Sequence, residues 1–128
     1  EDVVQRFGGK FFVEVKRDWT KVIKEWLESG GEGVHLTMYG LPLPEVIEEI
    51  RSSNRDKLII VGSEKVPRKV YEMATWNVSV TNQPISEVAA LAVFLDWLQQ
   101  HREFYIEFEN AKIKVIPSAR EKKVMRLA

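Results

Sequence analysis

Apolar residues recur along the chain in two rhythms, which predict alternating helices and strands. After Asp18, a candidate N-cap, apolar side chains from Trp19 to Leu27 follow at helical spacing and predict an amphipathic helix. Short β-branched and aromatic runs predict strands, and glycines or prolines separate them from further helices. The predicted strands are Phe11–Val15, Val34–Tyr39, Leu58–Val61 and Val78–Val80, and later helices begin at Pro44, Pro67 and Ser86.

Strand–helix alternation four times over predicts an α/β fold with a largely parallel sheet. The run Leu58–Val61 is fully apolar, which is typical of a strand buried in such a sheet. A chain of 128 residues is enough for one domain, so we expect a single domain over residues 1–128. Ligands of parallel sheets bind beyond the carboxyl ends of the strands, which here are followed by turn-forming residues.

The predicted helix over residues 86–101 is apolar on nearly every face. Such a helix requires cover on several sides, either from its own fold or from a partner subunit. Downstream, Ile106–Phe108 and Lys112–Ile116 flank a turn at Glu109–Ala111 and predict a β-hairpin, so that residues 98–128 form a C-terminal hairpin and basic tail.

Composition narrows the classes of function. Cysteine is absent, which excludes disulfides, thiolate catalysis and Cys-based metal sites. The two histidines are far apart in the sequence. His35 lies in the middle of a predicted strand, which is typical of a hydrogen-bonded structural histidine, and His101 ends a predicted helix, which is typical of a histidine that faces solvent. We therefore expect no metal site. No apolar run is long enough to span a membrane, so we expect a cytoplasmic protein without a membrane partner. Neither a dinucleotide fingerprint nor a P-loop is present, so the sequence gives no support to ordinary dinucleotide or P-loop binding.

Charge is unevenly distributed although the formal total is zero. Residues 111–128 carry six basic residues against Glu121, and the rest of the chain is correspondingly acidic. A basic end on an acidic body is typical of a segment that binds an anionic polymer. A solvated strand edge protected by lysines explains the same pattern equally well.

Four segments together resemble a known family. The stretch Asn82–Asp96 is the most specific, and Val61–Pro67, His35–Gly40 and Lys112–Pro117 with Arg120 add to it. The chain resembles the archaeal tRNA (cytidine-56) 2′-O-ribose methyltransferases of the SPOUT superfamily over essentially its whole length. The resemblance implies a C-terminal trefoil knot and methylation of a cytidine ribose 2′-hydroxyl in the T-loop of tRNA.

The resemblance also implies ligands and partners. S-adenosylmethionine would be the cofactor, tRNA the substrate, and a second copy of the chain the partner of the 86–101 helix. The implied cofactor-binding residues are Leu36, Gly62, Ser63, Glu64, Lys65, Val66, Val80, Thr81, Asn82, Gln83, Pro84, Ile85, Ser86 and Glu87. The RNA-binding candidates are Arg120, Lys122, Lys123, Lys112 and Lys114.

The chain also departs from the family pattern. Thr81 stands where the family has glycine, and Ile85 where it has histidine. Residues 3–7 before Gly8-Gly9 read as the last turns of a helix whose beginning is missing, which indicates that the family's upstream arginine motif is absent and that the catalytic residues stay unknown.

These departures are typical of a truncated or redesigned enzyme, and three alternatives stay open. The first is an active methyltransferase, and the second is a dimeric scaffold that keeps the knotted fold without turnover. The third is a flavodoxin-like nucleotide-binding domain, which agrees less well with the Asn82–Asp96 match.

Overall fold

The computed structural model describes residues 19–62 and 65–127 and divides the chain into two compact units. The larger unit is Lys16–Glu103, and the smaller one combines Glu1–Val15 with Phe104–Ala128. The helix expected at residues 3–7, the strand expected at Phe11–Val15 and the N-cap Asp18 lie outside the described residues.

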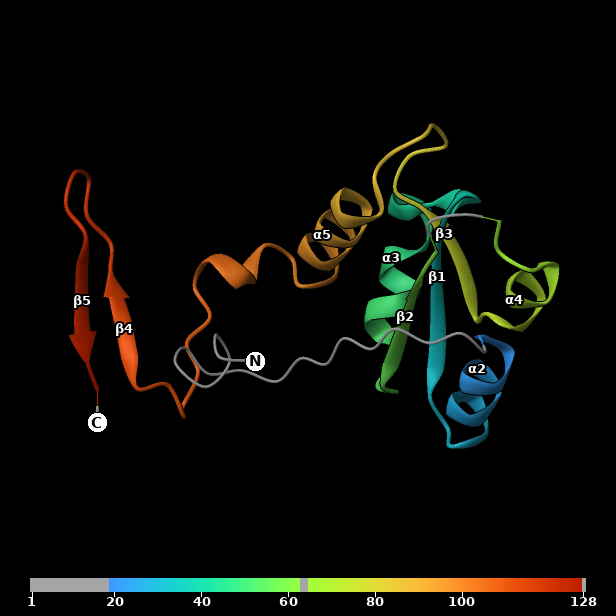
Figure 1. The fold of residues 1–128 in the computed structure, drawn as a ribbon, viewed down its shortest axis with the longest axis horizontal. Coiled ribbons are helices and arrows are strands. Elements are labelled where there is room, and N and C mark those ends of the chain that lie inside the picture. Colours follow the sequence, from blue (N-terminus) through green and yellow to red (C-terminus); the bar gives the residue numbers. More distant parts are fainter. Residues whose placement is uncertain (1–18, 63–64, 128) are drawn as a thin grey trace. The chain divides into compact units, whose positions relative to one another are not determined.

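A three-stranded parallel sheet forms the centre of the larger unit (Figure 1). Strand β1 (Glu32–Pro42) lies between β2 (Lys57–Val61) and β3 (Trp76–Ser79), and both neighbours run parallel to it. The predicted α/β class with a largely parallel sheet is therefore confirmed. Of the apolar run in β2 only Ile60 is buried, because within the described residues β2 pairs on one side only.

Helices cover both faces of this sheet, as Figure 1 shows. Helices α3 (Leu43–Ser52) and α5 (Glu87–Leu98) pack on one face, and α2 (Trp19–Glu28) and α4 (Arg68–Met73) on the other. Side-chain alternation along the strands supplies a core to each face. The α3/α5 core is Val34, Leu36, Leu43, Val46, Ile47, Ile50, Val78, Ala90 and Phe94, and the α2/α4 core is Ile23, Ile60 and Val70.

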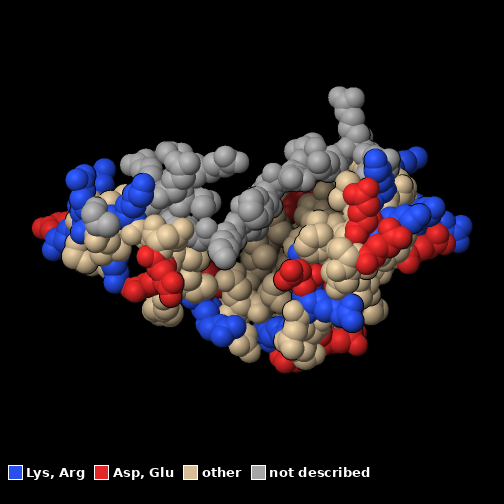
Figure 2. All heavy atoms as spheres, turned by 90° about the horizontal axis from the view of Figure 1, so that it is seen from below, with Lys and Arg blue, Asp and Glu red and all other residues tan. Residues whose placement is uncertain are grey.

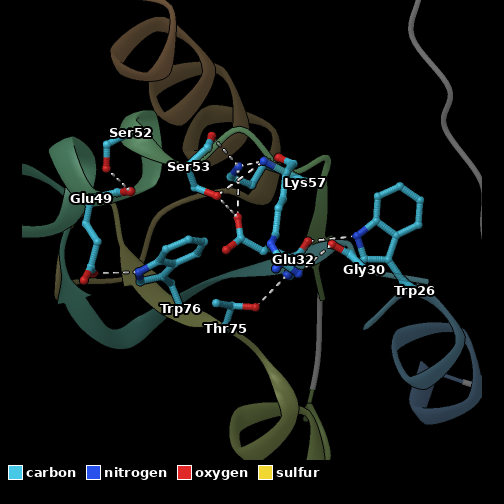
Figure 3. A network of polar contacts seen from close by, with 11 residues as sticks. Trp26, Gly30, Glu32, Glu49, Ser52, Ser53, Lys57, Thr75 and Trp76 are labelled. Carbon is cyan, nitrogen blue, oxygen red and sulfur yellow. Dashed lines mark hydrogen bonds and ion pairs between the residues drawn. The ribbon is translucent and has the colours of Figure 1, made fainter. Parts of the chain in front are cut away.

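A polar network holds the amino ends of the strands (Figure 3). The carboxylate of Glu32, at the start of β1, accepts a hydrogen bond from the Ser53 hydroxyl at 2.5 Å and pairs with the Lys57 ammonium at 3.1 Å. The Trp26 indole donates to the Glu32 carbonyl at 2.9 Å, and the Thr75 hydroxyl accepts from the Gly33 N–H at 3.0 Å. Side chains from α2, from β2 and from the segments before β2 and β3 thereby fix this end of the sheet.

Helix α5 is the apolar helix that the sequence predicts, but it is shorter. The Ser86 hydroxyl caps it by accepting from the Ala89 N–H at 3.1 Å, and the helix ends at Leu98 rather than His101. It ends early because Gln100 and His101 adopt positive φ angles of 55° and 64°, which no α-helix accommodates. Only Ala90 and Phe94 of α5 are buried, whereas Val88 is 79% exposed.

The smaller unit contains an antiparallel hairpin whose strands differ from those predicted. Strand β4 (Ile113–Ile116) pairs with β5 (Lys123–Arg126), whereas Ile106–Phe108 forms no strand. The predicted pairing of Ile106–Phe108 with Lys112–Ile116 is therefore wrong. The chain does turn before β4, where the Ala111 N–H donates to the Phe108 carbonyl at 3.3 Å, but the strand partner comes from the turn after it, where the Ser118 hydroxyl accepts from the Glu121 N–H at 3.1 Å.

Among residues 19–62 and 65–127, none of the helices has the length and apolar content that crossing a membrane requires.

Candidate functional site

A cavity of about 270 Å³ lies at the carboxyl ends of the three parallel strands. The end of β1, the turn after β2, the loop before α5 and the first turns of α5 all contribute to it. Its wall is mainly apolar, with one carboxylate and several hydroxyl groups. The lining residues are His35, Leu36, Thr37, Met38, Tyr39, Val61, Gly62, Val66, Tyr71, Val80, Thr81, Pro84, Ile85, Glu87 and Ala90.

The structure brings together eight of the residues that the resemblance implies for cofactor binding. Leu36, Gly62, Val66, Val80, Thr81, Pro84, Ile85 and Glu87 line the cavity. Lys65, Asn82, Gln83 and Ser86 do not line it, and Ser63 and Glu64 lie outside the described residues. Of the four that do not line it, Asn82 and Ser86 position the loop and the helix that do.

A bulge in β1 forms one wall of the cavity. Leu36 and Leu41 both pair with Val78 of β3, so the intervening residues bulge out of the ladder. Gly40 makes this possible because a Cβ at this position would lie 2.5 Å from the backbone of Asn77. The bulge carries Thr37, Met38 and Tyr39 into the cavity wall.

Asn82 connects the β3–α5 loop to this bulge. Its side-chain amide donates to the carbonyl oxygens of Met38 and Gly40, at 2.8 and 3.1 Å. Two carbonyls that the bulge removes from the sheet ladder thus gain a donor. Within the same loop, the Thr81 hydroxyl donates to the Gln83 carbonyl at 3.0 Å.

Gly62 permits close packing behind the cavity. A Cβ on Gly62 would lie 2.5 Å from Cη2 of Trp19 and 2.6 Å from Cγ2 of Val66. Two side chains of the protein therefore occupy the space beside this glycine.

A chain of polar contacts runs along the cavity wall from His35. Its Nδ1 lies 2.9 Å from Oδ1 of Asn77, and the Asn77 amide donates to the Tyr71 carbonyl at 2.8 Å. The Tyr71 hydroxyl in turn lies 2.9 Å from Oγ1 of Thr37. The prediction of a hydrogen-bonded histidine is confirmed, but sequence reasoning missed that His35, Thr37 and Tyr71 line a cavity.

Burial determines the charge of His35. Only 1% of its surface is exposed, and this desolvation lowers the pKa of His35, which the hydrogen bond with Asn77 offsets in part. Since the Asn77 amide nitrogen is already used as a donor to Tyr71, its Oδ1 must accept from His35. The imidazole is therefore neutral near pH 7, with its proton on Nδ1.

One buried hydroxyl near the cavity is unsatisfied. Ser79 is fully buried at the end of β3, next to the cavity-lining residue Val80, and its Oγ has no hydrogen-bond partner within the described part of the chain. Burying a hydroxyl without a partner opposes folding.

A second polar cluster lies beyond the end of α5. The His101 ring lies 2.7 Å from a carboxylate oxygen of Asp96. One carboxylate oxygen each of Asp96 and Glu103 and one ring nitrogen of His101, the atoms with which these side chains can bind a metal ion, lie within 4.8 Å of one another. Hydrogen bonding between the two carboxyl groups raises the pKa of Glu103 and lowers that of Asp96, which His101 also lowers. The positive φ of His101 returns its side chain to Asp96.

The RNA-binding candidates all lie in the C-terminal hairpin unit. Figure 2 shows the basic side chains of this unit, at the left of the view, around an uncharged centre. Lys114 pairs with Glu107 at 2.5 Å and Lys123 with Glu121 at 3.2 Å, whereas Arg120 and Lys122 are exposed. Lys114 lies opposite Met125 and Lys123 opposite Ile116, so these two lysines share one face of the hairpin.

The fold and the cavity define an α/β protein with a cavity at the carboxyl edge of a parallel sheet, which is the edge where such folds bind ligands. Comparison with known families gives the finer class. The sequence model of the family described as tRNA ribose 2′-O-methyltransferase, aTrm56, matches residues 7–125.

Relatives named tRNA (cytidine(56)-2′-O)-methyltransferase are identical to this chain at about half of the aligned positions. The Methanopyrus kandleri protein is 54% identical over 127 residues, which are 99% of this chain and 71% of the relative. The Methanothermobacter thermautotrophicus protein is 54% identical, covering 95% of this chain and 68% of the relative. The Pyrococcus horikoshii protein is 55% identical, and the alignment covers 99% of this chain and 63% of the relative. The chain belongs to the tRNA ribose 2′-O-methyltransferase family, and the resemblance found in the sequence is confirmed.

Proposed function

We propose that the protein transfers a methyl group from S-adenosylmethionine to the ribose 2′-hydroxyl of a cytidine in the T-loop of tRNA. The observation that carries this proposal is the family match over residues 7–125. Relatives at more than half identity are named for methylation at cytidine 56 of tRNA. A cavity at the carboxyl edge of the sheet is the place where an α/β fold binds such a cofactor.

The cavity has the chemistry that S-adenosylmethionine requires. Apolar side chains such as Leu36, Val66 and Val80 offer contact to a flat adenine. The Glu87 carboxylate offers an opposite charge to the sulfonium or the amino group. Its volume of about 270 Å³ is just below the range for small-molecule sites, about 300–1,000 Å³. The chemistry of the described lining residues fits the cofactor.

The residues of this chain would act by positioning. When bound, S-adenosylmethionine supplies the electrophilic methyl group. The bulge of β1 and the loop that Asn82 ties to it would hold the cofactor in one orientation relative to the ribose. Their apolar side chains would exclude water from the reacting groups. Such alignment is the main contribution that a methyl transfer requires of a protein.

A trefoil knot and a homodimer complete the proposal. The three loops around the cavity are those that the SPOUT resemblance threads into a knot. Val88, Val93 and Trp97 of α5 are 79%, 38% and 37% exposed, so this helix offers an apolar surface to a second copy. Light scattering tests the dimer: Val88→Asp should yield monomer, and Val88→Thr, which is nearly isosteric and uncharged, should leave the dimer intact. A monomeric wild-type protein contradicts it.

The basic hairpin would bind the phosphates of tRNA, and its exposed Arg120 and Lys122 are the first candidates. A cytoplasmic location stays a prediction that follows from this substrate.

Methyl transfer to unmodified tRNA tests the function. Tritiated S-adenosylmethionine should label a transcript with cytidine at position 56, and should not label one that carries 2′-deoxycytidine there. The two transcripts differ by one oxygen atom, so the difference reports the 2′-hydroxyl alone. Cofactor binding without labelling of either transcript would instead support the catalytically inactive scaffold.

A further inference from the structure

The wall of the cavity contains a buried titratable group for which the proposed methyl transfer has no use so far. His35 lies in the centre of β1, opposite Ile60 of β2 and Asn77 of β3. It is 1% exposed and lines the cavity. Its ring also meets the Tyr71 ring edge-on, with the ring centres 4.8 Å apart. Strand, helix and amide therefore hold the imidazole in one place.

The hydrogen bonds determine which ring nitrogen is free. Nδ1 donates to Asn77, so Nε2 of the neutral ring carries a lone pair and no proton. The unprotonated nitrogen carries a partial negative charge that attracts a cation, whereas the positive charge of an imidazolium repels one. His35 lines the cavity and is itself 1% exposed, so water screens the charge of its ring less than it would at the protein surface.

We propose that His35 is a specificity-determining residue of the cavity, which as a neutral imidazole favours a sulfonium ligand and as an imidazolium disfavours it. The inference rests on the proposed cofactor. It states that the cavity distinguishes the positively charged methyl donor from the uncharged thioether, S-adenosylhomocysteine, through the charge of His35. The two ligands differ by one methyl group and one positive charge, and the charge is the difference that responds to protonation of His35.

Few other titratable groups face this position. The residues opposite His35 on β2 and β3, Ile60 and Asn77, do not titrate. Among the described lining residues, α4 contributes the Tyr71 phenol, the end of β1 the Tyr39 phenol and α5 the Glu87 carboxylate. Among these three, Glu87 carries the carboxylate and therefore needs its own control.

Calorimetry with both ligands from pH 7.5 to pH 5.0 tests the inference. Linkage requires a ligand that disfavours the imidazolium to bind more weakly as the pH falls through the pKa of His35. The dissociation constant of S-adenosylmethionine should therefore rise about fivefold more than that of S-adenosylhomocysteine. Parallel changes for the two ligands would overturn the inference and leave the proposed cofactor standing. If neither ligand binds at pH 7.5, the proposed cofactor itself fails.

Two variants assign the effect. His35→Gln removes the titrating group but keeps a hydrogen-bonding side chain, and it should abolish the difference between the ligands. Glu87→Gln removes the nearby carboxylate and should leave the difference intact. A difference that survives in His35→Gln and disappears in Glu87→Gln would assign it to Glu87 and overturn the inference.

Proton NMR of the unmodified protein gives a second measurement, which does not depend on the folding of His35→Gln. The chain has two histidines, so His101→Asn leaves a single imidazole signal and assigns that of His35. The pKa of His35 should be lower with S-adenosylmethionine bound than with S-adenosylhomocysteine bound, by about half a unit or more. Equal pKa values in the two complexes would refute the inference.

Discussion

The side-chain amide of Asn82 donates to the Met38 carbonyl oxygen at 2.8 Å and so joins the loop before α5 to the bulge of β1. The two residues are 44 positions apart in sequence, and their contact links two segments that form parts of the cavity wall. Asn82 does not itself line the cavity. Its role is to hold the residues that do.

Replacing Asn82 should weaken cofactor binding more than folding. Asn82→Ala removes the donor to Met38 and Gly40, and each hydrogen bond of this kind contributes about 1 kcal/mol. We expect cofactor affinity to fall about tenfold in calorimetry, with a small change in the unfolding midpoint. Gln83→Ala is the control, because it truncates an exposed neighbour in the same loop. An equal loss in both variants would show that loop composition, not this contact, sets the affinity.

Adding one methyl group at Gly62 should destabilise the larger unit. The Cβ in Gly62→Ala would lie 2.5 Å from the Trp19 ring, so side chains must shift, at a cost of about 1–3 kcal/mol. Gly33→Ala is the matched control, since its Cβ would meet Ile60 at an ordinary 3.6 Å. Urea unfolding measures both. If Gly62→Ala is as stable as Gly33→Ala, Trp19 does not pack tightly there.

Stability should depend on Glu32 in a pH range set by its contacts. The Ser53 hydroxyl first, and then Lys57, lower the pKa of Glu32, although partial burial opposes this. A carboxyl with a lower pKa in the folded chain stabilises it above the unfolded value of about 4.3, and this contribution disappears as the pH falls through the folded pKa. Glu32→Gln should therefore unfold at lower urea concentrations than wild type at pH 7, and the difference should shrink below about pH 4. For the exposed Glu72→Gln we expect no such trend.

Removing the buried hydroxyl of Ser79 should not cost stability. Its Oγ has no partner within the described residues, so Ser79→Ala removes an unsatisfied group and should keep or raise the melting temperature. Thr37→Val also deletes one hydroxyl, but that hydroxyl is hydrogen-bonded to Tyr71. We expect it to lower the free energy of unfolding by about 1 kcal/mol. A large loss for Ser79→Ala would reveal a partner for its hydroxyl.

The C-terminal hairpin should contribute to tRNA affinity but not to cofactor affinity. Charge reversal of Lys122 and Lys123 to glutamate should weaken tRNA binding in filter assays and flatten its salt dependence, because phosphate contacts are lost. Reversal of Lys24 and Lys69, which are exposed in α2 and α4, changes net charge equally and serves as control. If tRNA binding survives reversal at the hairpin, the basic tail is a solvated edge.

Local pattern predicts much of this structure. The apolar runs at Val34–Tyr39 and Leu58–Val61 and the helix start at Ser86 place β1, β2 and α5 correctly, since each signal is contained in a few neighbouring residues. The choice of strand partner is not local. Ile106–Phe108 alternates between apolar and polar residues and Lys123–Arg126 does not, yet tertiary pairing selects Lys123–Arg126 as the partner of β4. Tyr71 likewise reads as an ordinary helix position, and its place in the cavity follows from the packing of α4 against β1.

The central position of β1 has a consequence for the kinetics of folding. Its partners are residues 57–61 and 76–79, so each ladder joins segments that are 25 or more residues apart, and neighbouring hairpins contribute nothing to this sheet. Closing such long loops precedes any gain from pairing, which slows the search for the native arrangement. Refolding of the larger unit should therefore take milliseconds to seconds, with β1 exposed to aggregation until both neighbours arrive.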